Sequence, residues 1–96
     1  MIGVSVNKQA KKRLHQERGA IEKLLEVMAM LRDKKFGCPW DLEQTLTSLI
    51  PHTIEEVYEV VDAIEEKDSE QIVDELGDLL FQVVFYAQIA SEEKLF

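Results

Sequence analysis

Two long stretches of helix-forming sequence are separated by a break of three residues, Lys67-Asp68-Ser69. Apolar residues recur every three or four positions from about residue 52 to 66, and a second helical pattern runs on to about residue 93. Asp68 and Gln71 have the spacing of a capping box, which marks the start of the second helix. Because the connection is so short, we predict that the two helices fold back on each other as an antiparallel hairpin.

The rest of the chain is also helical, apart from one loop. A helix is predicted from about residue 9 to 33 by apolar residues that share one face: Ile21, Leu24, Leu25, Met28 and Leu31. The segment Phe36-Gly37-Cys38-Pro39-Trp40 is expected to be a loop, because glycine and proline interrupt it. Asp41 and Gln44 resemble a capping box for a short helix near residues 42–49, and Pro51 would end that helix or open the next one. No segment has a convincing strand pattern, so the predicted fold class is all-α.

Composition limits the kind of protein this is. A chain of 96 residues that is 31% charged and 46% apolar suits one soluble globular domain. The formal net charge of −8 argues against nonspecific binding of nucleic acid. The chain shows neither a secretory signal nor an apolar run long enough to span a membrane. Cys38 is the single cysteine, so the chain cannot form an internal disulfide, which fits the reducing cytoplasm. Taken together, these features predict a cytoplasmic protein without membrane or nucleic-acid partners.

The charge is unevenly distributed. Residues 1–20 carry five Lys or Arg and one Glu, whereas residues 21–96 carry six Lys or Arg and eighteen acidic residues. We therefore divide the chain into a basic N-terminal arm, which includes the start of the first helix (residues 1–20), and a single domain (residues 21–96). The arm either contacts phosphate or an acidic partner, or is simply a solvated helix start.

Four carboxylates are placed symmetrically about the predicted turn. Glu56 and Glu59 precede it, Glu75 and Asp78 follow it, and each pair has the i,i+3 spacing that puts both side chains on one helix face. In a hairpin that turns at residue 67, the two pairs meet at the same height, about 12 Å from the turn. Four like charges so close together repel each other unless a cation lies among them.

A divalent metal site is therefore the first hypothesis for these carboxylates. One acidic pair alone would be read as a solvated surface, but two pairs in register beside apolar residues, with no Lys or Arg partner, favour a bound cation. Ligation by carboxylates alone suits Mg²⁺, or Mn²⁺, rather than zinc. Because Mg²⁺ held in this way usually shares its remaining positions with phosphates, the predicted chemistry is hydrolysis of a phosphate ester or phosphoanhydride.

The segment Leu79–Ala87 is apolar nearly all round. A helix of this kind has to be buried on all sides, and a chain of this length can hardly cover it. We therefore expect a subunit interface in a homodimer or higher homo-oligomer. The alternative is that the first helix and the short helix cover this segment within one chain.

Four motifs stand out together: Gly37-Cys38-Pro39-Trp40-Asp41, Gln44-Thr45, Glu55-Glu56-x-x-Glu59 and Glu75-Leu76-Gly77-Asp78-Leu79-Leu80. In this combination they resemble the MazG family of nucleoside triphosphate pyrophosphohydrolases, which are all-α enzymes. The resemblance covers about residues 22–96 and is closest to the N-terminal of the two MazG domains in longer bacterial MazG proteins.

This resemblance implies a MazG-like helical bundle completed by dimerisation, and hydrolysis of a (deoxy)nucleoside triphosphate to a monophosphate and pyrophosphate. The ligands of Mg²⁺ would be Glu56, Glu59, Glu75 and Asp78. The remaining motif glutamate, Glu55, would orient substrate or water, or be a surface residue.

Trp40 and Gln44 match the segment that precedes the site in the family, where contacts with the base or sugar are expected. For Trp40 the alternative is a place in the core.

The sequence also departs from the family. MazG domains usually continue beyond the position of Phe96 into a helix whose basic residues hold phosphates, and here only Lys94 lies near the end. The domain is therefore expected to be truncated at its C-terminus, or to receive basic groups from elsewhere, such as a partner subunit. This leaves an alternative function open: a catalytically weak MazG-like module that dimerises and binds nucleotide or metal within a larger MazG protein.

Overall fold

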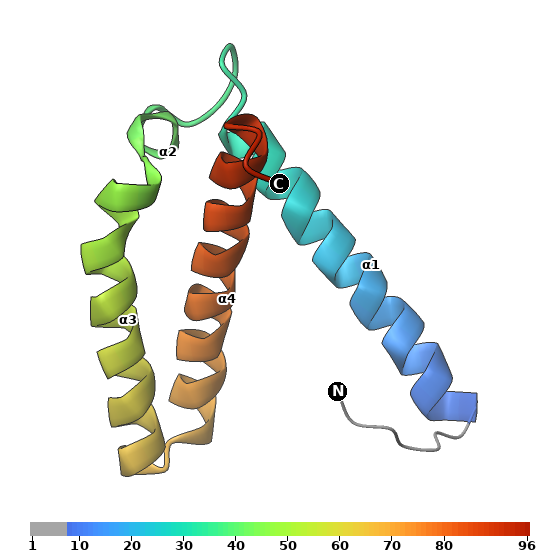
Figure 1. Cartoon of the computed structure of the whole chain (residues 1–96). Coiled ribbons are helices and arrows are strands. Elements are labelled where there is room, and N and C mark those ends of the chain that lie inside the picture. Colours follow the sequence, from blue (N-terminus) through green and yellow to red (C-terminus); the bar gives the residue numbers. More distant parts are fainter. Residues whose placement is uncertain (1–7) are drawn as a thin grey trace.

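The computed structural model describes the backbone of residues 8–96 and the side chains from residue 19 onward. Within this range the chain forms the helices α1 (Lys8–Leu31), α2 (Pro39–Glu43), α3 (Leu46–Glu66) and α4 (Ser69–Glu92), and no strand (Figure 1). The all-α prediction is confirmed. No described helix is long and apolar enough to cross a membrane. The predicted basic arm, residues 1–20, lies largely outside the described side chains.

Helices α3 and α4 form the predicted antiparallel hairpin, with its turn at Lys67 (Figure 1). Lys67 is left-handed, with a φ of 58°, and its N–H donates to the carbonyls of Ala63 and Ile64. The N–H of Asp68 also donates to Ala63, as in a Schellman motif. The Asp68 carboxylate then accepts the N–H of Gln71 and caps α4. The chain therefore reverses within two residues, which sets the register of the hairpin.

The predicted short helix near residues 42–49 is wrong in its boundaries. Helix α2 ends at Glu43, and α3 begins already at Leu46, because Thr45 and Ser48 form a full capping box. Thr45 accepts the N–H of Ser48 over 3.0 Å, and the Ser48 hydroxyl accepts the N–H of Thr45 over 2.8 Å. Pro51 consequently lies inside α3 rather than at a helix end, and α3 contains the second half of the expected short helix together with the expected long one.

The hydrophobic core lies at the open end of the hairpin, away from the turn. It consists of Met28 from α1, Leu49 from α3, and Val84, Phe85 and Ile89 from α4. Phe85 and Met28 are 2% and 0% exposed. Helix α1 reaches α4 only at this end and then diverges from the hairpin (Figure 1). Part of the apolar segment Leu79–Ala87 is thus covered within the chain.

A second apolar surface stays uncovered in the single chain. Leu80 and Val83 of α4 are 46% and 55% exposed, so α1 covers only part of Leu79–Ala87. The predicted apolar stripe of α3 is exposed as well; its members are Ile54, Val57, Val61 and Ile64. We name Ile54, Val57, Val61, Ile64, Leu76, Leu80 and Val83 the outer apolar face. Its residues recur at helical spacing, but on each helix of the hairpin they point away from the other helix and stay exposed.

The loop between α1 and α2 is held by local hydrogen bonds. The Asp33 carboxylate accepts the N–H groups of Lys35 and Phe36, which lowers the pKa of Asp33. Gly37 comes so close to the preceding backbone that a Cβ there would lie 2.4 Å from the carbonyl oxygens of Asp33 and Leu31. Only glycine fits at this position. The loop is shorter than predicted, because Pro39 and Trp40 are the first two residues of α2, where a proline is compatible with helix geometry.

Arg32 joins α1, α2 and α4 at this end. Its guanidinium donates to the carbonyls of Asp41 and Gln44 and forms an ion pair with Glu92 at 2.7 Å. The Arg32 side chain is only 8% exposed. A buried guanidinium that satisfies three acceptors contributes more than a surface ion pair does. It also lies 5.8 Å from the centre of the Phe85 ring, which ties it to the core.

We predict that Arg32→Met lowers the free energy of unfolding by about 2–3 kcal/mol, because two carbonyls and the Glu92 carboxylate lose their donor. The matched control is Lys34→Met, which removes an exposed cation nearby and should change stability by less than about 0.5 kcal/mol. Urea denaturation followed by circular dichroism measures both. Equal effects of the two substitutions would contradict the role given to Arg32.

Candidate metal centre

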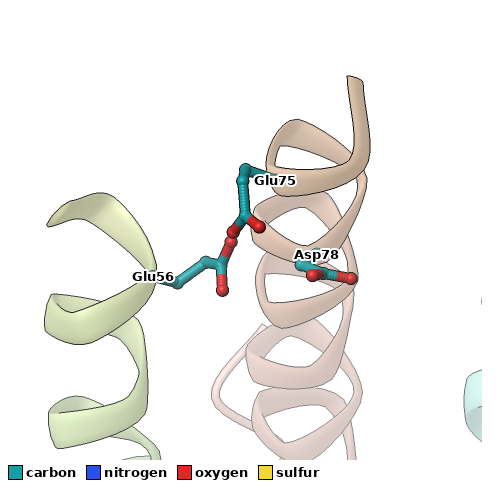
Figure 2. A group of neighbouring side chains, drawn as sticks. All are labelled: Glu56, Glu75 and Asp78. Atoms are coloured by element: carbon teal, nitrogen blue, oxygen red, sulfur yellow. The ribbon is translucent and has the colours of Figure 1, made fainter. Parts of the chain in front are cut away.

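Three carboxylates from the two hairpin helices converge in the middle of the hairpin. Glu56 comes from α3, Glu75 and Asp78 come from α4, and one oxygen of each lies within 4.8 Å of the others. Figure 2 shows Glu56 and Glu75 pointing at each other across the gap between the helices, with Asp78 beside them. Glu56 and Glu75 are only 8% and 7% exposed. The buried side of α3 therefore carries Glu56 together with the apolar residues Val60 and Ala63.

The electrostatics of these groups reflect their crowding. Burial, the hydrogen bond with Glu75 and the other nearby carboxylates raise the pKa of Glu56 to about 8. The hydrogen bond with Glu75 also raises the pKa of Glu59. The pKa of Glu75 is lowered, because it accepts hydrogen bonds from Glu56, Glu59 and Gln71. Without a cation, the cluster thus holds a proton in place of one negative charge.

When all of these carboxylates are ionised, two of them have a buried oxygen without a hydrogen-bond donor. They are Oε1 of Glu56 and Oε2 of Glu75. Buried oxygens of this kind are costly unless they are hydrogen-bonded or bind a cation. Because all the converging groups are carboxylates, the donor set suits a hard divalent ion such as Mg²⁺ or Mn²⁺. The residues present therefore fit a divalent metal site.

Glu59 and Glu55 stand apart from this group of three. Glu59 is exposed, contacts Glu75 and lines an adjoining cavity of about 300 Å³. The other residues lining that cavity are Asp62, Ala63, Glu66, Asp68, Gln71 and Glu75, with no Lys or Arg among the side chains described. Glu55 is exposed on α3, and its charge contributes to the raised pKa of Glu59. The structure thus brings Glu59 to the edge of the cluster and leaves Glu55 on the outer surface.

Trp40 lies at the end of the hairpin beyond the carboxylates. Its ring makes edge-to-face contacts with His52 at 5.8 Å and with Phe85 at 6.4 Å, and the residue is 50% exposed. His52 precedes Glu56 by one turn of α3, which is about 5.4 Å along the helix. One edge of Trp40 thus packs against the core residue Phe85, as the core alternative predicted, and half of the residue is exposed.

Gln44 is occupied by contacts within the chain. Its amide nitrogen donates to the carbonyl of Trp40 over 3.1 Å, and its amide oxygen accepts from the Ser48 hydroxyl over 2.8 Å. The cavity that it lines, about 640 Å³ in volume, contains Arg32 and Glu92 rather than the carboxylate cluster. Gln44 thus links α2 to α3 and holds the backbone of Trp40.

Sequence reasoning missed two glutamines next to the cluster. Gln71 precedes Glu75 by four residues, and its side chain donates to Glu75 over 2.7 Å instead of completing a capping box. Gln82 follows Asp78 by four residues, and its amide donates to the carbonyl of His52 over 3.3 Å. The sequence did contain a signal for both glutamines, since each lies four residues from an acid of the cluster and residues four apart share a helix face. The two glutamines therefore flank the acidic pair of α4 on both sides.

We predict that the metal-free protein becomes less stable as the pH rises from about 5.5 to 8.5. The pKa of Glu56 is about 8 in the folded protein, against a reference value of 4.5, so the folded state holds a proton that the unfolded chain has lost. Stability therefore falls as the pH rises through this window. The lowered pKa of Glu75 has the opposite effect on stability, but only at pH values below its reference pKa of 4.5.

Thermal melts in the presence of a chelator measure this dependence. Glu56→Gln should flatten it, whereas Glu65→Gln, an exposed residue of the same helix, should leave it unchanged. A melting temperature that stays constant or rises over the window in the native chain would show that the cluster does not hold the proton.

Comparison with known proteins agrees with this geometry. Residues 44–96 match the MazG nucleotide pyrophosphohydrolase domain. The chain is 58% identical over 76 residues to a nucleoside triphosphate pyrophosphohydrolase of Escherichia coli K12, an alignment that covers 79% of this chain and 29% of that protein. It is 51% identical over 75 residues to the nucleoside triphosphate pyrophosphohydrolase/pyrophosphatase MazG of Thermotoga maritima, covering 78% and 29%.

A more distant relative is a nucleoside triphosphate pyrophosphohydrolase of Mycobacterium tuberculosis, 42% identical over 71 residues, with 74% of this chain and 22% of that protein covered. The chain thus spans less than a third of the length of these curated relatives. The matched region contains α3, α4, the turn between them and every carboxylate of the cluster. On this evidence the chain belongs to the MazG nucleotide pyrophosphohydrolase domain family.

Proposed function

We propose that this domain hydrolyses (deoxy)nucleoside triphosphates to the monophosphate and pyrophosphate with the help of Mg²⁺, as a house-cleaning enzyme or a control on nucleotide pools. The observation that carries the proposal is the convergence of Glu56, Glu75 and Asp78, two of which have buried oxygens without a donor. The names of the relatives, nucleoside triphosphate pyrophosphohydrolases, support the choice of substrate class.

The carboxylates have the roles that such a reaction needs. Glu56, Glu75 and Asp78 would hold the ion between the helices, and Glu59 at the edge of the cluster would add the fourth carboxylate. A divalent ion held there would neutralise charge on the phosphates and would lower the pKa of an attached water. Gln71 keeps the Glu75 carboxylate in place through its hydrogen bond. Glu55 would assist from the α3 surface by orienting substrate or water.

Trp40 is the proposed contact for the nucleobase. It is half exposed and separated from Glu56 by the His52 ring and one helical turn, so a nucleotide whose base lies on Trp40 would direct its phosphates toward the carboxylates. Aromatic rings stack on any base, which suits a substrate class rather than one nucleotide. Gln44 would contribute by fixing the Trp40 backbone, since its own amide groups are engaged.

A second function follows from the lack of cations beside the site. The cavity next to the cluster contains no Lys or Arg among the described side chains, and Arg32 is engaged by Glu92. Triphosphates usually require such residues. The domain would then be a dimerising module that binds metal or nucleotide with weak turnover, within a protein of its relatives' length. Calorimetry that detects nucleotide binding without pyrophosphate formation would favour this function.

We further propose that the domain is a homodimer in which two hairpins pack through the outer apolar face. Seven large apolar residues of α3 and α4 are 41% to 55% exposed, and exposed apolar residues in such number favour a protein contact. Residues 54 and 80, and residues 57 and 76, lie at matching heights about the turn, so the face extends along both helices. Packing two copies would give a four-helix bundle with the carboxylates near its interior.

For the activity, we predict Mg²⁺-dependent release of pyrophosphate from nucleoside triphosphates, measured with a coupled phosphate assay. Asp78→Asn should reduce the rate by at least about 100-fold, because a ligand carboxylate is lost. The matched control is Asp74→Asn, an exposed acid on α4 outside the cluster, which should keep near-native activity. If the native chain releases no pyrophosphate at high protein concentration, the enzymatic proposal fails for this domain.

For the dimer, we predict that Val83→Glu raises the dissociation constant by roughly 100-fold, because a carboxylate would be buried in an apolar contact. Ser91→Glu adds the same charge to an exposed position at the end of α4 and should leave association unchanged. Sedimentation velocity over a concentration series distinguishes the two variants. A native chain that remains monomeric at all concentrations would refute the dimer.

A further inference from the structure

Three buried side-chain oxygens in the described part of the chain have no hydrogen-bond donor. Two belong to the carboxylates of Glu56 and Glu75, and the third is the amide oxygen, Oε1, of Gln82. Such atoms are uncommon in folded proteins, and each one requires an explanation. The three lie on the facing sides of the same two helices, so one explanation can account for all of them.

The position of the Gln82 amide is defined by its nitrogen, which donates to the carbonyl of His52 over 3.3 Å. In α3 the same carbonyl accepts the backbone N–H of Glu56, four residues later. The amide therefore lies beside the first turn that leads to Glu56. On its own helix, Gln82 follows Asp78 by one turn, and side chains of an α-helix lean toward its N-terminus, here toward Asp78. Both helices thus place this amide about one helical turn from the carboxylate cluster.

The orientation of the amide is also determined. If it were reversed, its oxygen would face the oxygen of the His52 carbonyl, which is repulsive, so the nitrogen has to point there and Oε1 has to point elsewhere. Oε1 is inaccessible to solvent, so bulk water does not satisfy it. A ligand that bound between the crowded carboxylates could supply the missing donor.

We propose that Gln82 is a positioning residue of the metal site, whose Oε1 accepts a hydrogen bond from the hydration shell of the bound divalent ion. The inference rests on the proposed function, because it requires the ion. Divalent ions such as Mg²⁺ keep several waters when carboxylates bind them, and these waters are strong donors. Gln82 and Gln71 then have complementary tasks on α4, since Gln71 orients a ligand carboxylate and Gln82 orients a water of the ion.

The test is the affinity of the metal-free chain for Mn²⁺, measured by calorimetry at a temperature where every variant is fully folded. Gln82→Leu removes both amide groups and should raise the Mn²⁺ dissociation constant at least about tenfold. Gln82→Glu removes the donor to His52 but keeps an acceptor, so it should bind Mn²⁺ at least as tightly as the native chain. Gln88→Leu is the matched control, a glutamine of α4 bonded to Glu92, and should not change the affinity.

Thermal stability without metal separates this role from a structural one. The melting temperature of Gln82→Leu should equal or exceed that of the native chain, because the substitution removes a buried acceptor that lacks a donor. The inference is overturned if Gln82→Leu binds Mn²⁺ as well as the native chain, or if Gln82→Glu loses affinity as Gln82→Leu does. A native chain that does not bind Mn²⁺ would refute the metal site itself, whereas native binding with unaffected Gln82 variants would refute only the part assigned to Gln82.

Discussion

The close approach of Glu56 and Glu75 between α3 and α4 is the constraint on which the rest of this domain depends. Most helix hairpins place their apolar stripes in contact, but here the facing sides carry carboxylates and glutamines in the middle of the hairpin. Like charges in a buried position oppose folding. The hairpin therefore has to obtain its stability elsewhere, and its acidic centre has to hold a proton or a cation.

Two regions supply that stability, one at each end of the hairpin. At the turn, the left-handed Lys67 and the Asp68 cap reverse the chain within two residues and set the register. At the open end, α1 adds Met28 to the core of α3 and α4, and Arg32 joins α1, α2 and α4. The acidic layer lies between these two regions. A carboxylate cluster that is unfavourable in itself is thereby held by rigid elements on both sides.

The same arrangement explains the outer apolar face. When the acidic sides of α3 and α4 face each other, their apolar residues are turned outward, and α1 diverges from the hairpin instead of covering them. The proposed metal site and the proposed dimer thus both depend on which side of each helix faces the other. A second hairpin would cover the exposed residues and surround the carboxylates with protein, which strengthens their interaction with a cation.

The sequence by itself determined the all-α class, the hairpin with its turn at Lys67, and the meeting of Glu56 with Glu75 and Asp78, because helical spacing and a short break are local properties. It was misleading where local signals compete: Pro51 suggested a helix boundary, but the capping box of Thr45 and Ser48 starts α3 earlier.

Only the tertiary structure decided which side of each helix faces inward. Periodicity identified the stripe of Ile54, Val57, Val61 and Ile64 without showing that it remains exposed. It also could not separate Glu59 from the group of three, or reveal the unpaired oxygen of Gln82. These features depend on how two helices are rotated about their axes, and that rotation is set by the turn and the core at the two ends of the hairpin.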